Sequence, residues 1–322
     1  MSSFGLIADV GGTNIRLATI DLASGTINNI HKFLCGDYPS ITDVMQEFQS
    51  KVGVESKFAC IAIACPTDND WIDMTNNSWA FSQKEVAATM GFEEFHVIND
   101  FTGIAMSLPT LKAEQLVQVG GTQAPQSNKP IAVYGPGTGL GVAHLMNHGG
   151  EYICLPGEGG HVEFAASDDT EAYILAFLQQ ELGHVSAERL ISGPGLVNIY
   201  RGLCQYQDFE AEDFQPADIT ERGLSGECIV CRETLEIFCR MLGSFGGNLA
   251  LNLLTYGGVY IAGGIVSRFM EFFLESDFRT RFEDKGRFSE LMKKIPVFVI
   301  TEEQPGLQGA GAYLRQSKGY KI

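Results

Sequence analysis

The feature that most constrains the fold is a strand–turn–strand pattern that occurs twice. The first copy, Phe4 to Ile20, places apolar residues on both sides of Gly11-Gly12-Thr13-Asn14. The second, Ile131 to Met146, surrounds the alternating glycines of residues 135–141. Apolar runs flanking a glycine- and asparagine-rich turn are typical of β-hairpins. Aligning the two Gly-Thr steps pairs GGTNIRLA with PGTGLGVA, which favours two related α/β lobes, although a match this short also arises by chance.

The rest of the chain alternates short apolar runs with helical patterns, which indicates an α/β protein. Strands are predicted at residues 58–65, 95–98, 257–265 (ending in a glycine turn) and 296–300. Helices are predicted at residues 101–108, 170–182, 195–200, 231–254, 266–274 and 309–316. The segment GGTQAPQSNKP, near residues 120–130, has the composition of a loop or linker.

The charge balance limits the kind of partner. The chain has 22 Lys and Arg against 39 Asp and Glu, a formal net charge of −17. Nucleic acids and anionic membranes require basic surface, so neither is an expected partner. A phosphate ligand is compatible with this charge, because backbone N–H groups and a metal bind phosphate without Lys or Arg. Without a long apolar run or a signal-peptide pattern, a cytoplasmic location is predicted.

The eight cysteines are scattered, several of them in apolar runs such as FACIAIAC. In a cytoplasmic chain they are interpreted as small buried hydrophobic residues. Cys228-x-x-Cys231 is a single pair with no second pair and no nearby pair of histidines. This spacing alone favours neither a zinc site nor a redox site.

Two glycine turns are candidate phosphate sites. At Asp9-Val10-Gly11-Gly12-Thr13-Asn14 a strand delivers a carboxylate, glycines permit close backbone approach, and Thr13 and Asn14 add donors. This suits a magnesium triphosphate, with Asp9 holding Mg²⁺, often through water; the alternative is an ordinary turn. Residues 135–141 match neither GxGxxG nor a P-loop. A solvent-exposed hairpin rarely needs four glycines, so close approach to a ligand is the favoured interpretation.

Three further segments carry polar groups with an ordinary structural alternative. Gly263-Gly264 ends a strand and suits either a nucleotide base and ribose or tight helix–strand packing. Asn99-Asp100 lies where a strand meets a helix, which suits either a ligand or a helix N-cap. Glu158 and His161, three apart among glycines, suit either one polar ligand or an exposed loop.

A fourth segment, Ser186-Ala187-Glu188-Arg189, offers Glu188 as a ligand or as half of a surface ion pair with Arg189.

Taken in order, these motifs resemble those of bacterial glucokinases, in the superfamily of sugar kinases, actin and Hsp70 ATPases. The resemblance covers essentially the whole chain and includes INDFTGIAM, VYGPGTGLGVAHL, LPGEGGHVEF, GHVSAERLISGPGLVN and GGVYIAGGIVSRF. It implies an α/β, two-lobed actin-like ATPase (ribonuclease H-like) fold with mixed sheets and an interlobe cleft. A small lobe over residues 1–110, joined by the C-terminal segment 301–322, and a large lobe over residues 111–300 are expected.

The resemblance also implies a reaction, transfer of the ATP γ-phosphoryl group to the 6-hydroxyl of D-glucose at the start of glycolysis. The residues that would hold MgATP are Asp9, Gly11, Gly12, Thr13, Asn14, Gly137, Thr138 and Gly139 at the phosphates, and Gly263 and Gly264 near the adenosine. The residues that would bind glucose are Asn99, Asp100, Glu158, His161 and Glu188, with Asp100 as the base.

Members of this kind are commonly homodimers, and a homodimer is expected here. A related sugar-kinase group carries a cysteine-rich zinc motif after a histidine, and no such cysteines follow His161. No structural zinc is therefore expected. Two alternatives stay open at this stage: a kinase for another hexose, such as mannose or N-acetylglucosamine, and a nucleotide-binding regulator of the same superfamily without kinase activity.

Overall fold

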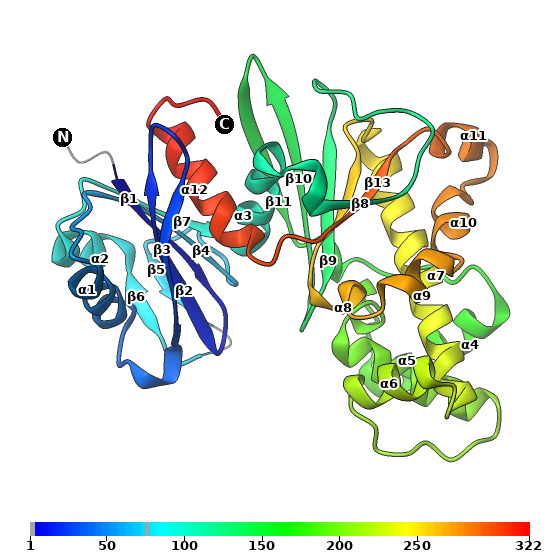
Figure 1. Ribbon diagram of the computed structural model, residues 1–322. Coiled ribbons are helices and arrows are strands. Elements are labelled where there is room, and N and C mark those ends of the chain that lie inside the picture. Colours follow the sequence, from blue (N-terminus) through cyan, green and yellow to red (C-terminus); the bar gives the residue numbers. More distant parts are fainter. Residues whose placement is uncertain (1–3, 75–76) are drawn as a thin grey trace. The chain divides into compact units, whose positions relative to one another are not determined.

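The computed structural model describes residues 4–74 and 77–322, which divide into two compact units (Figure 1). Unit 1 comprises the described part of residues 1–113 together with residues 147–156 and 302–322. Unit 2 comprises residues 114–146 and 157–301. The lobe limits expected from the sequence, 1–110 with 301–322 and 111–300, did not anticipate that residues 147–156 group with unit 1. Those limits stay predictions, and residues 1–3 lie outside the described residues.

Unit 1 is built on a mixed five-stranded sheet. Its order is β3 (Ile27–Leu34), β2 (Asn14–Asp21), β1 (Phe4–Val10), β4 (Phe58–Ile63) and β7 (Glu94–Asn99). Strands β1, β2 and β3 are antiparallel neighbours, whereas β4 runs parallel to both β1 and β7. The hairpin predicted around the Gly-Gly-Thr-Asn turn is confirmed. A separate two-stranded sheet pairs β5 (Trp71–Asp73) with β6 (Ala80–Ser82).

Helices cover both faces of this sheet (Figure 1). Because successive side chains of a strand point to opposite faces, β1 contributes to two cores. Leu6, Ala8 and Val10 pack in the core that contains α1 (Ile41–Val52) and α2 (Gln83–Met90). Ile7 packs in the core that contains α12 (Pro305–Ser317), and α12 contacts α3 (Asp100–Ser107).

Glycines bring α12 close to α3. A Cβ atom on Gly309 would overlap the carbonyl oxygen of Gly103, and one on Gly103 would lie 3.0 Å from the Cβ of Ala62 and 3.3 Å from the carbonyl oxygen of Gly306. Neither helix therefore tolerates a larger residue at the contact without a backbone shift. The contact fixes the N-terminal ends of both helices relative to the sheet.

Unit 2 contains a six-stranded sheet. Its order is β11 (Glu151–Gly157), β10 (Leu140–His148), β9 (Ile131–Pro136), β12 (Val259–Ile261), β13 (Val297–Ile300) and β8 (Leu116–Gly120), with β10 and β11 each crossing the limit between the units. Strand β9 is antiparallel to β10 and parallel to β12, and β12 is parallel to β13. Five strands thus repeat the order of the unit 1 sheet, and the two related α/β lobes inferred from the hairpin match are confirmed.

The helices of unit 2 enclose a single large core. They are α4 (Asp169–Leu182), α5 (Gly193–Tyr206), α6 (Pro216–Ser225), α7 (Ile229–Leu253), α8 (Gly264–Ser267), α9 (Met270–Glu275), α10 (Phe278–Glu283) and α11 (Ser289–Met292). Helix α7 is tied to the sheet by Tyr134, whose hydroxyl donates to the carbonyl oxygen of Leu242 at 3.0 Å.

The prediction of a single helix over residues 266–274 is wrong. The chain forms α8 and α9, separated where the N–H groups of Arg268 and Phe269 donate to carbonyl groups three residues earlier. That tight turn places Phe269 in the core, 3% exposed. Among the described residues, no helix combines the length and apolar character needed to span a membrane.

Candidate functional site

The turn of the first hairpin is closed by its own backbone. The N–H of Gly11 donates to the carbonyl oxygen of Asn14 at 2.9 Å. The side-chain oxygen Oδ1 of Asn14 is buried and has no hydrogen-bond partner among the residues that the structure describes. A buried polar atom without a partner is costly in a folded chain. Asn14 therefore suits a ligand or a bound ion at this turn.

Cys35 supports this turn from the side. Its N–H donates to the carbonyl oxygen of Thr13 at 2.9 Å, and its sulfur lies 3.6 Å from the carbonyl oxygen of Gly11. The two carbonyl groups that flank Gly12 are thus both held by one residue. The sequence alone indicated for Cys35 only a buried hydrophobic residue, because its partners lie 22 and more positions away in the chain.

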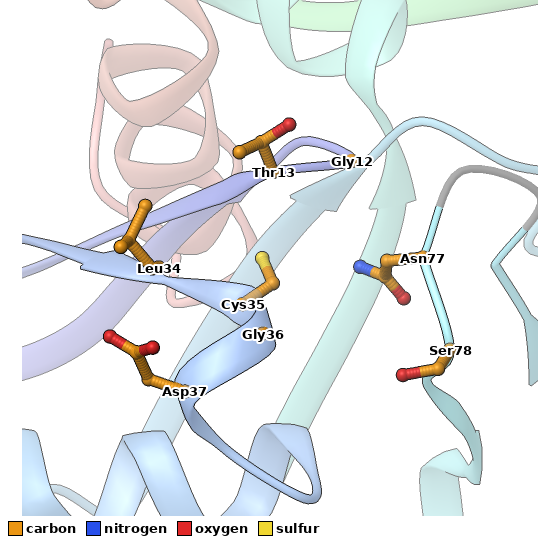
Figure 2. A pocket seen from close by; sticks show the side chains of 8 residues that line it. All are labelled: Gly12, Thr13, Leu34, Cys35, Gly36, Asp37, Asn77 and Ser78. Atoms are coloured by element: carbon orange, nitrogen blue, oxygen red, sulfur yellow. The ribbon is translucent and has the colours of Figure 1, made fainter.

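A cavity of about 500 Å³ opens beside the turn (Figure 2). Its lining residues are Gly12, Thr13, Leu34, Cys35, Gly36, Asp37, Asn77 and Ser78, all from unit 1. Figure 2 shows the amide nitrogen of Asn77 directed toward Cys35 from the opposite wall. The turn therefore borders open space on this side instead of packing against a neighbouring element.

Asp9 lies near the end of β1, next to the turn. Its side chain is 25% exposed and faces Arg16. The Asp9 Oδ2 to Arg16 Nη1 distance is 3.7 Å, and the two residues are cross-strand partners. Burial raises the pKa of the Asp9 carboxyl above its usual value, and Arg16 opposes that rise. A Cβ atom on Gly306 would lie 2.9 Å from Asp9 Oδ1, so the carboxylate lies against the first turn of α12. The roles of Arg16 and Gly306 were not predicted from the sequence; the hairpin register was the available signal for Arg16.

The donor atoms near Asp9 are compatible with magnesium, and the metal role of Asp9 stays a prediction. Mg²⁺ in phosphate sites is held by one or two carboxylates, by phosphate oxygens and by water, and it prefers oxygen donors. Asp9 supplies the carboxylate, and the unpartnered Oδ1 of Asn14 is a second oxygen on the same turn. Within residues 4–74 and 77–322 there is no group of three or more His, Cys, Asp and Glu side chains that would form an all-protein metal cage.

Asn99 and Asp100 begin helix α3 at the end of β7. Asn99 is the N-cap: its Oδ1 accepts hydrogen bonds from the N–H groups of Phe101, at 2.9 Å, and Thr102, at 3.3 Å. Asp100 Oδ1 accepts from the Phe101 N–H at 2.9 Å. The N-cap interpretation is therefore confirmed for Asn99, and its role toward a ligand stays a prediction.

The electrostatic surroundings of Asp100 differ from those of an exposed aspartate. Burial raises its pKa to about 6, and the negative charge of Asp9 adds to the rise, whereas the hydrogen bonds from the Phe101 N–H and the Asn99 side chain oppose it. Asp9 and Asp100 thus lie close enough to influence each other. Near neutral pH the carboxylate is ionised yet has a raised proton affinity, which is the combination expected of a general base.

In unit 2, Glu188 is joined to the turn of the second hairpin. Its Oε2 accepts a hydrogen bond from the N–H of Leu140 at 2.8 Å, and a Cβ atom on Gly139 would overlap the same oxygen. Gly193 N–H, at the start of α5, donates to the carbonyl oxygen of Gly137 at 2.8 Å. The alternation of glycine in this turn therefore serves, in part, the close approach of a protein carboxylate.

Glu158 and His161 lie on a short loop that packs against β10, the strand that begins with Leu140. A Cβ atom on Gly160 would overlap the carbonyl oxygen of Leu140, and Ala187 N–H donates to the carbonyl oxygen of Val162 at 2.8 Å. The loop, the Glu188 segment and the hairpin turn therefore meet around Leu140. The Glu158 and His161 side chains are 75% and 60% exposed, with Oε2 and Nε2 4.0 Å apart. Of the two interpretations that the sequence allowed, the exposed polar loop is the one that describes these two side chains in the structure.

The glycines at the end of β12 have two different roles. A Cβ atom on Gly263, whose φ is +89°, would lie 2.5 Å from the carbonyl oxygen of Pro136, and one on Gly135 would overlap the carbonyl oxygen of Ala262. Gly263 is thus packed tightly, but against strand β9 and not in the helix–strand contact that the sequence suggested. Gly264 and Gly137 have open space where a side chain would lie. Both of these glycines leave room for a ligand.

The fold is the actin-like two-lobed fold of sugar kinases, as solved structures show. The crystal structure of a glucokinase from an Antarctic psychrotroph has a TM-score of 0.91 and 36% identity, covering 98% of this chain and 100% of that one. A ROK family glucokinase from Streptomyces griseus, in complex with glucose and AMPPNP, shares the fold: TM-score 0.64, 18% identity, 97% and 99% coverage. The fold class predicted from the sequence is confirmed.

Sequence comparison is more specific. A family model described as Glucokinase matches residues 6–317. The glucokinase of Tolumonas auensis is 56% identical over 317 residues, covering 98% of each chain. That of Yersinia enterocolitica is 54% identical over 322 residues, covering 100% of this chain and 99% of the relative. The chain belongs to the glucokinase family, and it is an enzyme that phosphorylates glucose with ATP. The alternative functions considered from the sequence are not favoured.

Proposed function

We propose that Asp100 is the general base that accepts the proton of the glucose 6-hydroxyl as the γ-phosphoryl group of ATP is transferred. The observation that carries this assignment is the position of Asp100, a partly buried carboxylate at the N-terminus of α3, close enough to Asp9 for the two charges to interact. A sugar hydroxyl is a poor nucleophile until a base takes its proton. Phosphoryl transfer otherwise depends on positioning and charge neutralisation, which the glycine turns and a metal ion supply.

For the nucleotide, the proposal assigns the phosphates of MgATP to Asp9, Gly11, Gly12, Thr13, Asn14, Gly137, Thr138 and Gly139, and the adenosine to Gly263 and Gly264. The unpartnered Asn14 Oδ1 and the open space at Gly137 and Gly264 support it. When bound, Mg²⁺ neutralises phosphate charge. The chain's own contribution is to hold the turn rigid, through Cys35, and to orient Asp9 between Arg16 and α12.

For the sugar, the proposal assigns the glucose hydroxyls to Asn99, Asp100, Glu158, His161 and Glu188. Carboxylates accept hydrogen bonds from adjacent hydroxyls, and imidazole donates or accepts according to its tautomer. The exposed Glu158 and His161 side chains are accessible to such a ligand. Glu188 has one oxygen fixed by the Leu140 N–H, which orients its carboxylate before any sugar binds. Asn99 acts in part through its cap, which positions Asp100.

The proposal also includes magnesium as the metal, a homodimeric assembly and a cytoplasmic location. The oxygen donors at Asp9 and Asn14 support magnesium. The family resemblance supports a homodimer. The use of ATP, an intracellular nucleotide, supports the cytoplasmic location. Equilibrium sedimentation tests the assembly: a mass of twice 35.1 kDa is expected, and a mass of 35.1 kDa at micromolar concentration would contradict it.

The reaction is tested by measuring ADP release with Mg²⁺ and ATP over a panel of sugars. Glucose is expected to give the highest kcat/KM, with mannose and N-acetylglucosamine lower, because buried polar groups left unmet by a mismatched sugar cost about 1–3 kcal/mol each. Buffer without sugar gives the rate of ATP hydrolysis. A rate with glucose no higher than this hydrolysis rate would contradict the proposal.

The pH dependence follows from the raised pKa of Asp100. The base acts only when ionised, so kcat/KM for glucose is expected to be half-maximal near pH 6 and to fall about tenfold per unit below it. ADP is measured directly by chromatography, since coupling enzymes have their own pH dependence. Enzyme incubated at pH 5 and returned to pH 7.5 provides the control for unfolding. An unchanged kcat/KM between pH 8 and pH 5 would rule out a base with this pKa.

Replacing Glu158 by glutamine is expected to raise the KM for glucose about ten- to a hundredfold, with a smaller loss of kcat, because a charged acceptor for a sugar hydroxyl is removed. Glu163→Gln is the matched control, since Glu163 is an exposed carboxylate five residues along the same segment. Initial rates over a range of glucose concentrations give both constants. Equal effects of the two substitutions would show that Glu158 has no specific role.

A further inference from the structure

Three cysteines that the kinase reaction does not use lie together in unit 2. Cys204 is on α5, Cys228 precedes α7, and Cys231 is in its first turn. The charge of Cys228 acts on both of the other thiols, and that of Cys204 acts on Cys231, so the three groups are neighbours in space. All eight cysteines of the chain are free thiols.

Cys228 and Cys231 lie next to each other at the start of α7. Cys228 is the N-cap of α7, with an extended backbone, and its sulfur accepts a hydrogen bond from the N–H of Cys231 at 3.4 Å. An N-cap side chain folds back over the first turn, and this hydrogen bond places the Cys228 sulfur beside the backbone of Cys231. A disulfide between them requires Cβ atoms about 3.5–4.5 Å apart, so the first turn of α7 must accommodate that spacing when the bond forms.

Their surroundings assign the two sulfurs different roles. Cys228 is partly exposed, whereas Cys231 and Cys204 are buried, 0% and 1% exposed. Burial raises the pKa of Cys231 to about 12, and the nearby Arg222 guanidinium opposes that rise. Cys204 forms a hydrogen bond with Tyr200. A disulfide in solution therefore meets Cys228 first, at the N-terminal end of a 25-residue helix.

We propose that Cys228 and Cys231 form a redox-active dithiol that exchanges with low-molecular-weight disulfides. The Cys228 thiolate attacks one sulfur of the disulfide, forms a mixed disulfide and releases one thiolate. The Cys231 sulfur then attacks Cys228 and its proton passes to the departing thiolate, which forms the Cys228–Cys231 disulfide and releases a second low-molecular-weight thiol. The protein loses two electrons and two protons, and the disulfide is reduced to two thiols.

The sequence alone favoured no redox role for this pair, because CxxC had no recognisable setting. The structure provides that setting: an N-cap sulfur that receives a hydrogen bond, a neighbouring guanidinium, and a partner sulfur one helical turn away. The inference does not depend on the proposed kinase residues. Its failure would leave the assignment of Asp100 unaffected.

The test treats the folded, reduced chain with oxidised glutathione, then alkylates free thiols in denaturant and digests with trypsin. Cleavage after Arg201, Arg222 and Arg232 places Cys204 in one peptide and both Cys228 and Cys231 in another. The expected product is the 223–232 peptide with an internal disulfide, while the peptide of Cys204 is alkylated. Dithiothreitol is expected to restore alkylation of both cysteines.

Three variants separate the steps. Cys231→Ala is expected to stop at the mixed disulfide on Cys228. Cys228→Ser, which keeps a good N-cap, is expected to slow all modification of this peptide at least tenfold. Cys204→Ser is the control and is expected to form the disulfide as the native chain does. Circular dichroism checks that each variant is folded.

Two results would overturn the proposal. One is a 223–232 peptide that stays fully alkylated in the native chain while another cysteine is modified. The other is a disulfide that joins Cys204 to this peptide as the main product, since that would make Cys204, and not Cys231, the partner of Cys228.

Discussion

Replacing Asp100 by asparagine is expected to lower kcat by about two to four orders of magnitude, the range typical of a lost general base. Asparagine is nearly isosteric, and its side-chain oxygen can still accept the hydrogen bond from the Phe101 N–H. The start of α3 and the glucose contacts should therefore persist. Glucose binding, measured by calorimetry without nucleotide, is expected to change less than about tenfold.

The matched control is Asp73→Asn. Asp73 is a carboxylate of the same unit whose charge, like that of Asp100, acts on Cys65. The control removes one negative charge from this region and is expected to keep near-normal turnover. Near-normal turnover in Asp100→Asn itself would refute the base assignment. A parallel loss of glucose affinity and kcat would point instead to a damaged sugar site.

Gly309→Ala is expected to destabilise the chain by about 1–3 kcal/mol or more, although alanine is the better helix former by about 1 kcal/mol. The added Cβ overlaps the carbonyl oxygen of Gly103, a backbone atom that no rotamer change can move aside. Helices α3 and α12 must separate, which displaces the ends that hold Asp100 and contact Asp9. We expect the midpoint of urea denaturation and kcat to fall together.

Two further substitutions calibrate that result. At Gly36 no atom lies within 4 Å of the place that a Cβ would take, so Gly36→Ala is expected to leave stability within about 0.5 kcal/mol. At Gly311 a Cβ atom would lie 2.6 Å from the Cδ1 of Ile20, the end of a flexible side chain, so Gly311→Ala is expected to give an intermediate loss. An unchanged denaturation midpoint in Gly309→Ala would show that the two helices are not held at this distance.

The strands that could be predicted from the sequence are the ones buried on both faces. β1 and β4 are continuous apolar runs because helices cover each side of the sheet. β3, with the sequence INNIHKFL, was missed because only Phe33 in it is buried, so no apolar run marks the strand. Helix α1 was also missed, although its signals were present: Ser40 as N-cap, and buried residues at 41, 44, 45 and 48.

The residues of the candidate site also fall into two groups, those that a local sequence motif reveals and those that it does not. Asp9, Asn99, Asp100 and Glu188 could be proposed as candidates because each lies in a short motif that is visible along the chain. Arg16, Cys35 and Gly306 were not, because each acts across a strand pair or from another element. Their residue types carry no local signal of that role. Only the register of the hairpin and the path of α12 bring them to Asp9 and its turn.

The hydrogen bond from Leu140 to Glu188 has a consequence for how the two substrates bind. In the proposed assignment, one carboxylate contacts a sugar hydroxyl on one side and the backbone of a phosphate-binding turn on the other. Any displacement of Glu188 on glucose binding would therefore alter the turn. If glucose changes the affinity of the chain for nucleotide by some factor, thermodynamic reciprocity requires that nucleotide change the affinity for glucose by that same factor. The binding of glucose and the binding of ATP would thus be thermodynamically coupled, and not independent of each other.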